Sequence, residues 1–363
     1  GFGWVHNRPP GTLGKGFHYD VDPETNHLSV SDPKLQESID VLTENSLKGI
    51  QSEDIYHIDY TKDERVKEKK ITGVRTRIFS GEPQQYLIVC KRFFGAFGKY
   101  VTDFHADLPF KIGMNVRSNE WDAMWKKAAR VGNTGFDGDV FEFDASTHTS
   151  LALECTHAIN KWYELHDEDW KPEDDLARLT LIEQFFHGKH IAADMVYQRE
   201  HGTPSGHFLT AILNSMILLS YIHSAWLDRF PDSSYEEMVS CLWIAVYGDD
   251  SIVVVKDGVE FTLRIFKDYM STLNIVITPG DKSQDFDKMK TLSELSFLKH
   301  TTRVVDNVWF PVIEKSTING LLNWVRVPKG VTLAEAYRER LVDALANVIL
   351  YDDIDIFDEI HST

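Results

Sequence analysis

The chain has few cysteines and no long uninterrupted apolar run. Its 363 residues include three cysteines, Cys90, Cys155 and Cys241, which lie far apart and form no CxxC pair. A structural zinc site or a disulfide framework is therefore not expected, and a reducing compartment is the default. The longest apolar stretch, AILNSMILLSYIHSAWL, contains Asn, Ser and His and is too short and polar to cross a bilayer. No membrane span is predicted.

Positive charge is also scarce. Lys and Arg total 38 against 56 acidic residues, which gives a formal net charge of −18. This balance argues mildly against a nucleic-acid partner, although binding depends on local patches rather than on net charge. The most basic segment is residues 62–77, KDERVKEKKITGVRTR, with seven Lys or Arg against three acids. Taken alone, it indicates a solvated charged face.

Several motifs are absent. The sequence contains no HExxH, no GxSxG and no internal repeat, which makes a metalloprotease or another hydrolase a distant possibility. The short run HGKH, from His187 to His190, is predicted to lie on the surface. Because no low-complexity linker separates the chain into blocks, interwoven lobes are expected.

Hydrophobic patterning predicts the main elements. Helical spacing indicates helices over residues 151–166, 209–226 and 331–350, and Thr332 with Glu335 forms a capping box for the last of them. Residues 243–256, WIAVYGDDSIVVVK, predict a β-hairpin because β-branched and aromatic residues flank a Gly-Asp turn.

Two adjacent carboxylates, Asp249 and Asp250, lie at the predicted hairpin tip. Alone they indicate an ordinary turn; alternatively they bind a divalent cation such as Mg²⁺, which prefers oxygen ligands. A cation site needs a further carboxylate, and the segment FDGDVFEFDAS offers Asp139 and Asp144. Their odd separation places them on opposite faces of a straight strand, so a bend is needed for both to serve a site. The alternative for Asp144 is to cap the next helix together with Ser146.

A glycine-containing loop that leads into a helix, GTPSGHFLTAILNSM, contributes Ser205, Thr210 and Asn214. Thr210 and Asn214 are four residues apart and share one helix face. They either bind a ligand or hydrogen-bond to the neighbouring backbone.

In their order and spacing, these segments resemble the 3D-type RNA-dependent RNA polymerases of picorna-like positive-strand RNA viruses (order Picornavirales-like). The resemblance covers nearly the whole chain. It is carried by the motifs KDERVKEKKITGVRTRIF, DVFEFD, SGHFLTAILN, YGDD, TPGDKS and FLKH, with GFGW as the tail of a further fingers motif. The family has a stretch before that motif, so the chain is expected to be N-terminally incomplete.

The resemblance implies an α+β right-hand polymerase with a small antiparallel palm sheet backed by helices. The implied domains are partial fingers over 1–105, the first part of the palm over 106–174, a fingers insertion over 175–203, the second part of the palm over 204–305 and a partial thumb over 306–363.

The resemblance also implies the roles of individual residues. Asp139, Asp249 and Asp250 would hold two Mg²⁺ ions, with Mn²⁺ as a substitute. The residues implied to contact the nucleotide are Lys70, Arg75, Arg77, Asp144, Ser205, Thr210 and Asn214. Lys282 matches a candidate general acid for the pyrophosphate, with an exposed surface lysine as the alternative.

Partners and location follow from the resemblance alone. The implied partners are an RNA template and primer, NTPs, a genome-linked protein primer and other viral replication proteins. The implied location is the host cytoplasm, at membrane-associated viral replication complexes.

Two rival functions remain open. The first is a reverse transcriptase or DNA polymerase with the same palm. Asp144 argues against it, since the side chain would accept a hydrogen bond from a ribose hydroxyl. The second is a non-catalytic RNA-binding protein that retains the polymerase fold, and the intact Asp139, Asp249 and Asp250 argue against that.

Overall fold

The computed structural model describes residues 16–64, 72–73, 76–280, 285–323, 325–351 and 358. The chain forms two compact units, each interrupted in sequence by the other. Unit 1 consists of Gly1–Phe104 with Glu142–Leu218, and unit 2 consists of His105–Phe141 with Leu219–Thr363. Helices and largely antiparallel sheets occur together, which confirms the predicted α+β class.

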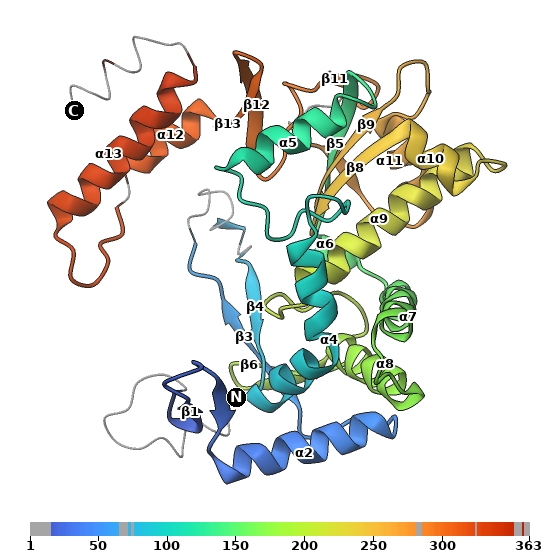
Figure 1. Ribbon diagram of the computed structural model, residues 1–363, viewed down its shortest axis with the longest axis vertical. Coiled ribbons are helices and arrows are strands. Elements are labelled where there is room, and N and C mark those ends of the chain that lie inside the picture. The colour runs from blue at the N-terminus through green and yellow to red at the C-terminus, as the bar shows by residue number, and fades with distance from the viewer. Residues whose placement is uncertain are drawn as a thin grey trace. The chain divides into compact units, whose positions relative to one another are not determined.

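Unit 1 contains a four-stranded sheet, a two-stranded sheet and several helices (Figure 1). Its strands are β1 (Tyr19–Val21), β2 (Leu28–Val30), β3 (Tyr56–Thr61), β4 (Ile78–Gly81), β6 (Lys189–Ala192) and β7 (Met195–Gln198). Its helices are the 3₁₀ helix η1 (Gly16–His18), α2 (Pro33–Leu47), α4 (Gln84–Asp103), α6 (Phe143–Ser146), α7 (Thr149–His166) and α8 (Pro172–Phe186). Helix α9 (Thr210–Arg229) begins in unit 1 and carries the chain into unit 2.

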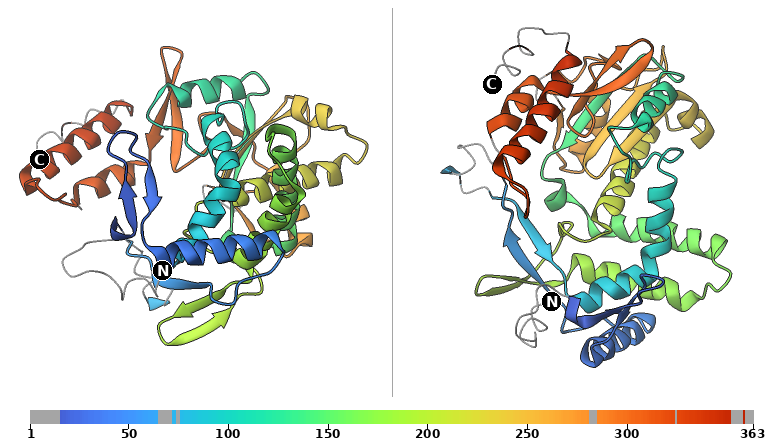
Figure 2. Two further views of the ribbon diagram at one scale, coloured as in Figure 1. Left: turned by 60° about the horizontal axis from the view of Figure 1, so that its bottom comes forward. Right: turned by 60° about the vertical axis from the view of Figure 1, so that its left-hand side comes forward.

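The four-stranded sheet of unit 1 joins segments that are distant in sequence. Its strand order is β4-β3-β6-β7, and β3 and β6 are parallel. Figure 2 shows β6 and β7 as a hairpin. The predicted surface position of the HGKH run is wrong for His190, which is fully buried and has Nδ1 3.0 Å from Asp59 Oδ1. His190 is buried because β6 pairs with β3, and local sequence patterns do not reveal this long-range pairing.

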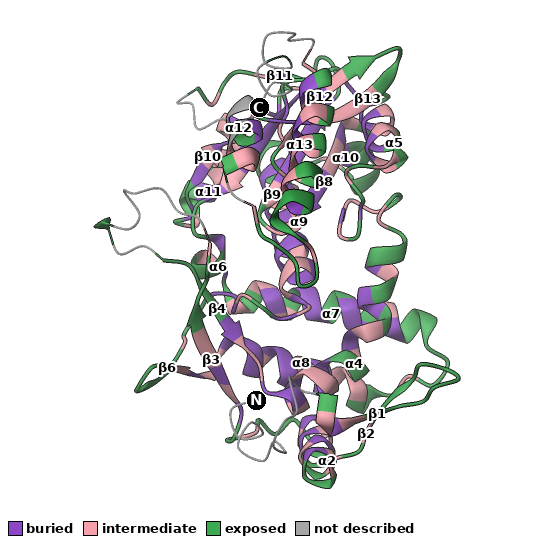
Figure 3. Cartoon of the chain, turned by 90° about the vertical axis from the view of Figure 1, so that its left-hand side faces the viewer, coloured by how far each residue is buried: buried purple, intermediate pink, exposed green. Residues whose placement is uncertain are grey.

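Helix α2 illustrates how local sequence sets an element of unit 1. Asp32 caps its N-terminus by accepting hydrogen bonds from the backbone N–H groups of the second and third residues that follow it, a position where Asp is strongly preferred. Leu35, Ile39 and Leu42 recur at helical spacing and are buried. The opposite side of the helix is exposed (Figure 3), so α2 covers the interior of unit 1 with one face.

Unit 2 contains a five-stranded sheet and a separate two-stranded sheet. Its strands are β5 (Thr134–Val140), β8 (Leu242–Tyr247), β9 (Asp250–Val255), β10 (Ile277–Pro279), β11 (Lys290–Thr291), β12 (His300–Val305) and β13 (Val308–Ile313). Its helices are α5 (Asn119–Ala128), α10 (Tyr235–Cys241), α11 (Leu263–Thr272), α12 (Lys315–Asn323) and α13 (Leu333–Ile349).

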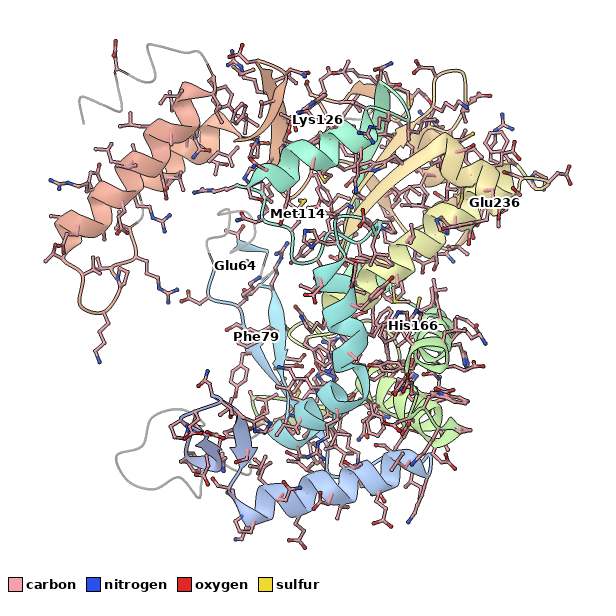
Figure 4. The ribbon with its side chains drawn as sticks, viewed as in Figure 1. Glu64, Phe79, Met114, Lys126, His166 and Glu236 are labelled. Carbon is pink, nitrogen blue, oxygen red and sulfur yellow. The ribbon has the colours of Figure 1, made fainter. Side chains whose placement is uncertain are left out.

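The main sheet of unit 2 is antiparallel and has the order β10-β5-β9-β8, with β11 also paired to β5. One face packs on α5, whose Trp121 and Trp125 are fully buried in one cluster with Ile252. Figure 4 shows this side of unit 2, with Lys126 labelled on α5 and Met114 on the segment before it. On the other face the Phe136 ring lies 6.4 Å from that of Phe266 on α11. Helices therefore back the small sheet, as predicted.

The predicted helices are present as α7, α9 and α13, and the capping box of Thr332 and Glu335 is formed. Among the described residues, α9 alone passes a test of length and apolar composition for a membrane span. Of its most apolar window, 61% is buried inside the protein, which is the behaviour of a core helix.

Candidate active site

The predicted hairpin is formed by β8 and β9, and Tyr247 pairs with Asp250 across it. Gly248 and Asp249 form the two-residue turn between these partners. Gly248 has a φ of +64°, a left-handed conformation that glycine adopts without the steric cost of a Cβ. The Gly-Asp-Asp sequence thus places Asp249 in the turn, where it is exposed, and Asp250 at the first position of β9.

Strand β5 brings the next carboxylate to this turn. In the β5–β9 register Asp139 lies directly opposite Asp250. Side chains of directly opposite residues project from the same face, with Cβ atoms about 5 Å apart. The structure therefore brings together Asp139 and Asp250, with Asp249 adjacent in the chain.

The Asp250 carboxylate is costly to ionise in this setting. The pKa of Asp250 is raised to about 6, first by burial and then by the negative charges of Asp249 and Asp139. A hydrogen bond from the backbone N–H of Leu298 to Asp250 Oδ2, 3.1 Å long, opposes that rise. The site accumulates negative charge that a cation would neutralise.

Two residues beside this cluster were not predicted to take part in the site. Asp137, two positions before Asp139, forms a buried ion pair with Lys290 across 2.7 Å. The i, i+2 spacing of the two aspartates on one strand face is a signal that sequence reasoning could have used. The amide of Leu298 gave no such signal, because a backbone N–H carries no residue identity.

The donor set fits a hard divalent cation. Within the part of the chain that the structure describes, no three His, Cys, Asp or Glu side chains form a ready-made metal-binding group. Mg²⁺ is commonly held by one or two carboxylates, with water and substrate phosphates completing its shell. The opposed pair of Asp139 and Asp250 meets that requirement.

Asp144 belongs to unit 1 and follows a break in the strand. Glu142 adopts a left-handed φ of +49° after β5 ends, and Asp144 lies in the short helix α6. The bend that the sequence called for is therefore present. Asp144 and Ser146 do not cap α7, because the N-cap residue of that helix is His148. The Asp144 side chain is exposed.

The backbone of Asp144 meets the loop that leads to Ser205. Its carbonyl oxygen accepts a hydrogen bond from the N–H of Thr203 at 2.7 Å. The carbonyl of Ser205 accepts from the N–H of Ser80 on β4, also at 2.7 Å. Three segments of unit 1, from α6, β4 and the loop before α9, are thereby fixed to one another.

The two polar residues on one face of α9, Thr210 and Asn214, differ in whether their side chains find a hydrogen-bond partner. Thr210 Oγ1 donates to the carbonyl of Pro204 at 2.9 Å, so its hydroxyl satisfies the neighbouring backbone. Asn214 is 8% exposed, and its Oδ1 has no hydrogen-bond partner in the described part of the protein. A buried acceptor without a donor is costly, which marks Asn214 Oδ1 as a position suited to a ligand hydroxyl.

The predicted phosphate-binding residues are only partly described. Arg77 is exposed, and its Nε lies 3.7 Å from Glu64 Oε1. Figure 4 labels Glu64 and Phe79 on the adjoining part of the same unit. Lys70, Arg75 and Lys282 lie outside the described residues.

Comparison with known proteins agrees with the resemblance in the motifs. Residues 29–360 match the family model of viral RNA-dependent RNA polymerases. The genome polyprotein of Rice tungro spherical virus (strain Vt6) is 26% identical over 99% of this chain and 11% of its own length. The replicase polyprotein of Cricket paralysis virus is 27% identical over 86% of this chain and 18% of its length. The chain thus spans less than a fifth of these relatives.

The fold agrees as well. A solved structure titled Sicinivirus 3Dpol RNA dependent RNA polymerase superposes with a TM-score of 0.75. The match covers 93% of this chain and 70% of that one at 20% sequence identity, so it supports the right-hand polymerase fold. The family model spans most of the chain, and the protein therefore belongs to the viral RNA-dependent RNA polymerases.

Proposed function

We propose that the chain catalyses RNA-directed RNA synthesis and that Asp139, Asp249 and Asp250 carry this activity. They would do so by holding the divalent cations, Mg²⁺ with Mn²⁺ as a substitute. The reaction transfers a nucleotide from an NTP to the 3′-hydroxyl of RNA on an RNA template. The observation that supports the assignment is the opposed pair of Asp139 and Asp250 beside the Gly248–Asp249 turn. When bound, the cations activate the attacking hydroxyl and neutralise phosphate charge.

The rest of the chemistry is positioning. Asp250 is held by the Leu298 amide, so its carboxylate keeps one orientation in a rigid sheet. Asp249 is exposed on the turn, where its carboxylate would be available to hold a cation. Lys70, Arg75 and Arg77 bind the triphosphate, since guanidinium groups match phosphate oxygens and lysine supplies a point charge. Lys282 donates a proton to the departing pyrophosphate.

A separate set of residues, all in unit 1, selects the sugar of the incoming nucleotide. Asp144 and Asn214 hydrogen-bond the ribose hydroxyls, supported by Ser205 and Thr210. The unsatisfied Oδ1 of Asn214 is the supporting observation. A site built to bond a hydroxyl rejects a substrate that lacks it, so ribonucleotides are favoured over deoxyribonucleotides.

The larger assignments are part of the same proposal. The domains are fingers over 1–105 and 175–203, palm over 106–174 and 204–305, and thumb over 306–363. The relatives are viral polyproteins, of which this chain matches a part, which supports a role in genome replication in the host cytoplasm, at membrane-associated complexes. An RNA template and primer, a genome-linked protein primer and other viral proteins are the expected partners.

Primer extension tests this function directly. The chain is given a short RNA template and primer with Mg²⁺ and labelled ribonucleotides or deoxyribonucleotides. We expect ribonucleotide incorporation that Asp249→Asn abolishes.

The matched control is Asp257→Asn, which neutralises an exposed carboxylate just beyond the other end of β9. It is expected to keep parental activity. Incorporation by Asp249→Asn at the parental rate would remove Asp249 from the mechanism, and equal use of both sugars would contradict the ribose site.

A further inference from the structure

Next to the carboxylate cluster of unit 2 lies a buried ion pair that the proposed mechanism leaves unused. Lys290 Nζ lies 2.7 Å from Asp137 Oδ1, and the two side chains are 9% and 3% exposed. Buried charges of this kind are rare and strongly coupled to their surroundings. The pair joins β5, which carries Asp139, to β11, which begins the segment 290–300.

The Asp137 carboxylate holds this segment at two points. Oδ1 accepts from Lys290, and Oδ2 accepts from the backbone N–H of Ser296 at 2.7 Å. The space around it is filled, since a Cβ added to Gly280 would lie 2.9 Å from the Asp137 carboxyl carbon. Asp137 therefore has little freedom to move, and residues 290–296 are fixed relative to β5.

The segment then makes a tight turn. Phe297 and His300 exchange two backbone hydrogen bonds of 2.9 Å. Leu298 and Lys299 between them have φ values of +50° and +63°, as a type I′ turn requires. Neither is glycine, so the surrounding structure must impose this conformation. Phe297, fully buried in the cluster of Trp121 and Ile252, supplies one anchor.

The constrained turn directs one backbone group at the carboxylate cluster. The N–H of Leu298 donates to Asp250 Oδ2 at 3.1 Å. A continuous set of contacts thus runs from Asp137 and Lys290, through Ser296 and Phe297, to Asp250. Every member belongs to unit 2.

We propose that Asp137 and Lys290 are positioning residues that orient Asp250 for cation binding through the Leu298 turn. The inference rests on the proposed function, in which Asp250 is a cation ligand. Loss of the pair releases the 290–298 segment, frees the Asp250 carboxylate to rotate and weakens cation binding. The nucleotide-binding residues are not part of this set of contacts.

The test measures cation dependence. RNA synthesis at saturating NTP is titrated with Mn²⁺, and Mn²⁺ binding without substrate is followed by electron paramagnetic resonance. The variant Asp137→Leu/Lys290→Met removes both charges and retains the side-chain volume, a change that buried ion pairs often tolerate. We expect the half-saturating Mn²⁺ concentration to rise about tenfold in both assays, with the KM for NTP within about twofold of the parent.

Two further variants guard against misfolding. Asp137→Asn keeps the shape of the side chain and is expected to raise the half-saturating concentration about threefold. Lys288→Met removes an exposed charge two residues before Lys290. This control is expected to leave the half-saturating Mn²⁺ concentration unchanged. Parental Mn²⁺ dependence in folded Asp137→Asn, or an equal loss of rate at every Mn²⁺ concentration, overturns the proposal. Absence of cation-dependent synthesis in the parent would instead refute the proposed function.

Discussion

Asp139 and Asp250 lie directly opposite each other on antiparallel strands β5 and β9, and Asp249 adds a third carboxylate at the adjoining turn. Like charges in opposed positions destabilise a sheet, and partial burial raises the pKa of Asp250 to about 6. The sheet therefore forms against the repulsion of its own side chains unless a cation is bound. Folding stability and cation binding are linked at this point.

Mg²⁺ should raise the midpoint of thermal unfolding of the parent chain. A ligand at about 100 times its Kd that binds only the folded state stabilises it by about 2.7 kcal/mol. Asp139→Asn and Asp250→Asn should lose most of this rise, whereas Asp257→Asn should keep it. Scanning calorimetry with and without Mg²⁺ checks the prediction, and an undiminished rise in Asp250→Asn would contradict it.

Without metal, Asp250→Asn should be more stable than the parent at pH 8. The folded pKa of Asp250, about 6, lies above the ordinary value of 3.8, so ionisation favours the unfolded chain. The resulting loss of folding stability is absent below about pH 4, grows towards pH 6 and is complete above pH 6.

We expect the free energy of unfolding of Asp250→Asn to exceed that of the parent by about 1–2 kcal/mol at pH 8. Two pKa units correspond to about 3 kcal/mol before screening by solvent. Thermal midpoints of the two chains in EDTA measure it. A difference no larger at pH 8 than at pH 5 would refute the prediction.

Asn214→Ala should relax sugar selection at little cost in stability. The Oδ1 of Asn214 has no hydrogen-bond partner to lose within the described structure. We expect the ratio of ribonucleotide to deoxyribonucleotide incorporation to fall about tenfold, as for a lost hydroxyl contact. Single-turnover rates with matched nucleotides give the ratio. An unchanged ratio in a folded variant would exclude Asn214 from the ribose site.

Gly206→Ala should distort the loop before α9. Gly206 has a φ of +124°, and an added Cβ would lie 2.7 Å from the carbonyl oxygen of Ser80. We expect a loss of about 1–3 kcal/mol in stability and a raised KM for NTP.

Gly95→Ala is the matched control, because Gly95 lies inside α4 and an added Cβ there would meet no neighbouring atom within 4 Å. That helical substitution should stabilise the chain by about 0.5–1 kcal/mol. Chemical denaturation and NTP titration of the two variants check the prediction, and equal stability of both would contradict it.

The sequence was informative where chemistry depends on side chains in local patterns. The YGDD hairpin and the helices α7, α9 and α13 follow from spacing and turn chemistry. Spacing offered Asp139 only as a candidate, and the resemblance to the polymerase family placed it beside the hairpin, where the strand register has it. The alternative in which Asp144 and Ser146 cap α7 failed because the chain continues to His148 before the helix begins. Asp144 and Ser146 lie in the short helix α6, which ends before α7 begins. Residue propensities do not show which polar residue will cap the helix.

Long-range pairing explains what sequence reasoning missed. The burial of His190 depends on the parallel pairing of β6 with β3. The Asp137–Lys290 pair joins positions on two strands distant in the chain, and the Leu298 amide reaches Asp250 only because of a left-handed turn at two non-glycine residues. The spacing of Asp137 and Asp139 marks a shared strand face, but no local pattern identifies Lys290, β3 or the Leu298 amide as the partner.

The order of the strands has a consequence for synthesis on the ribosome. Strand β5 emerges first, whereas its partners β9, β10 and β11 all lie in the later part of the chain. Until β9 has been translated, residues 134–139 of β5 lack their pairing partners, and an open strand edge is exposed to association with other chains. The opposed carboxylates do not exist as a pair in that interval. The cation site proposed here therefore cannot be assembled until residues 139 and 250 have both left the ribosome.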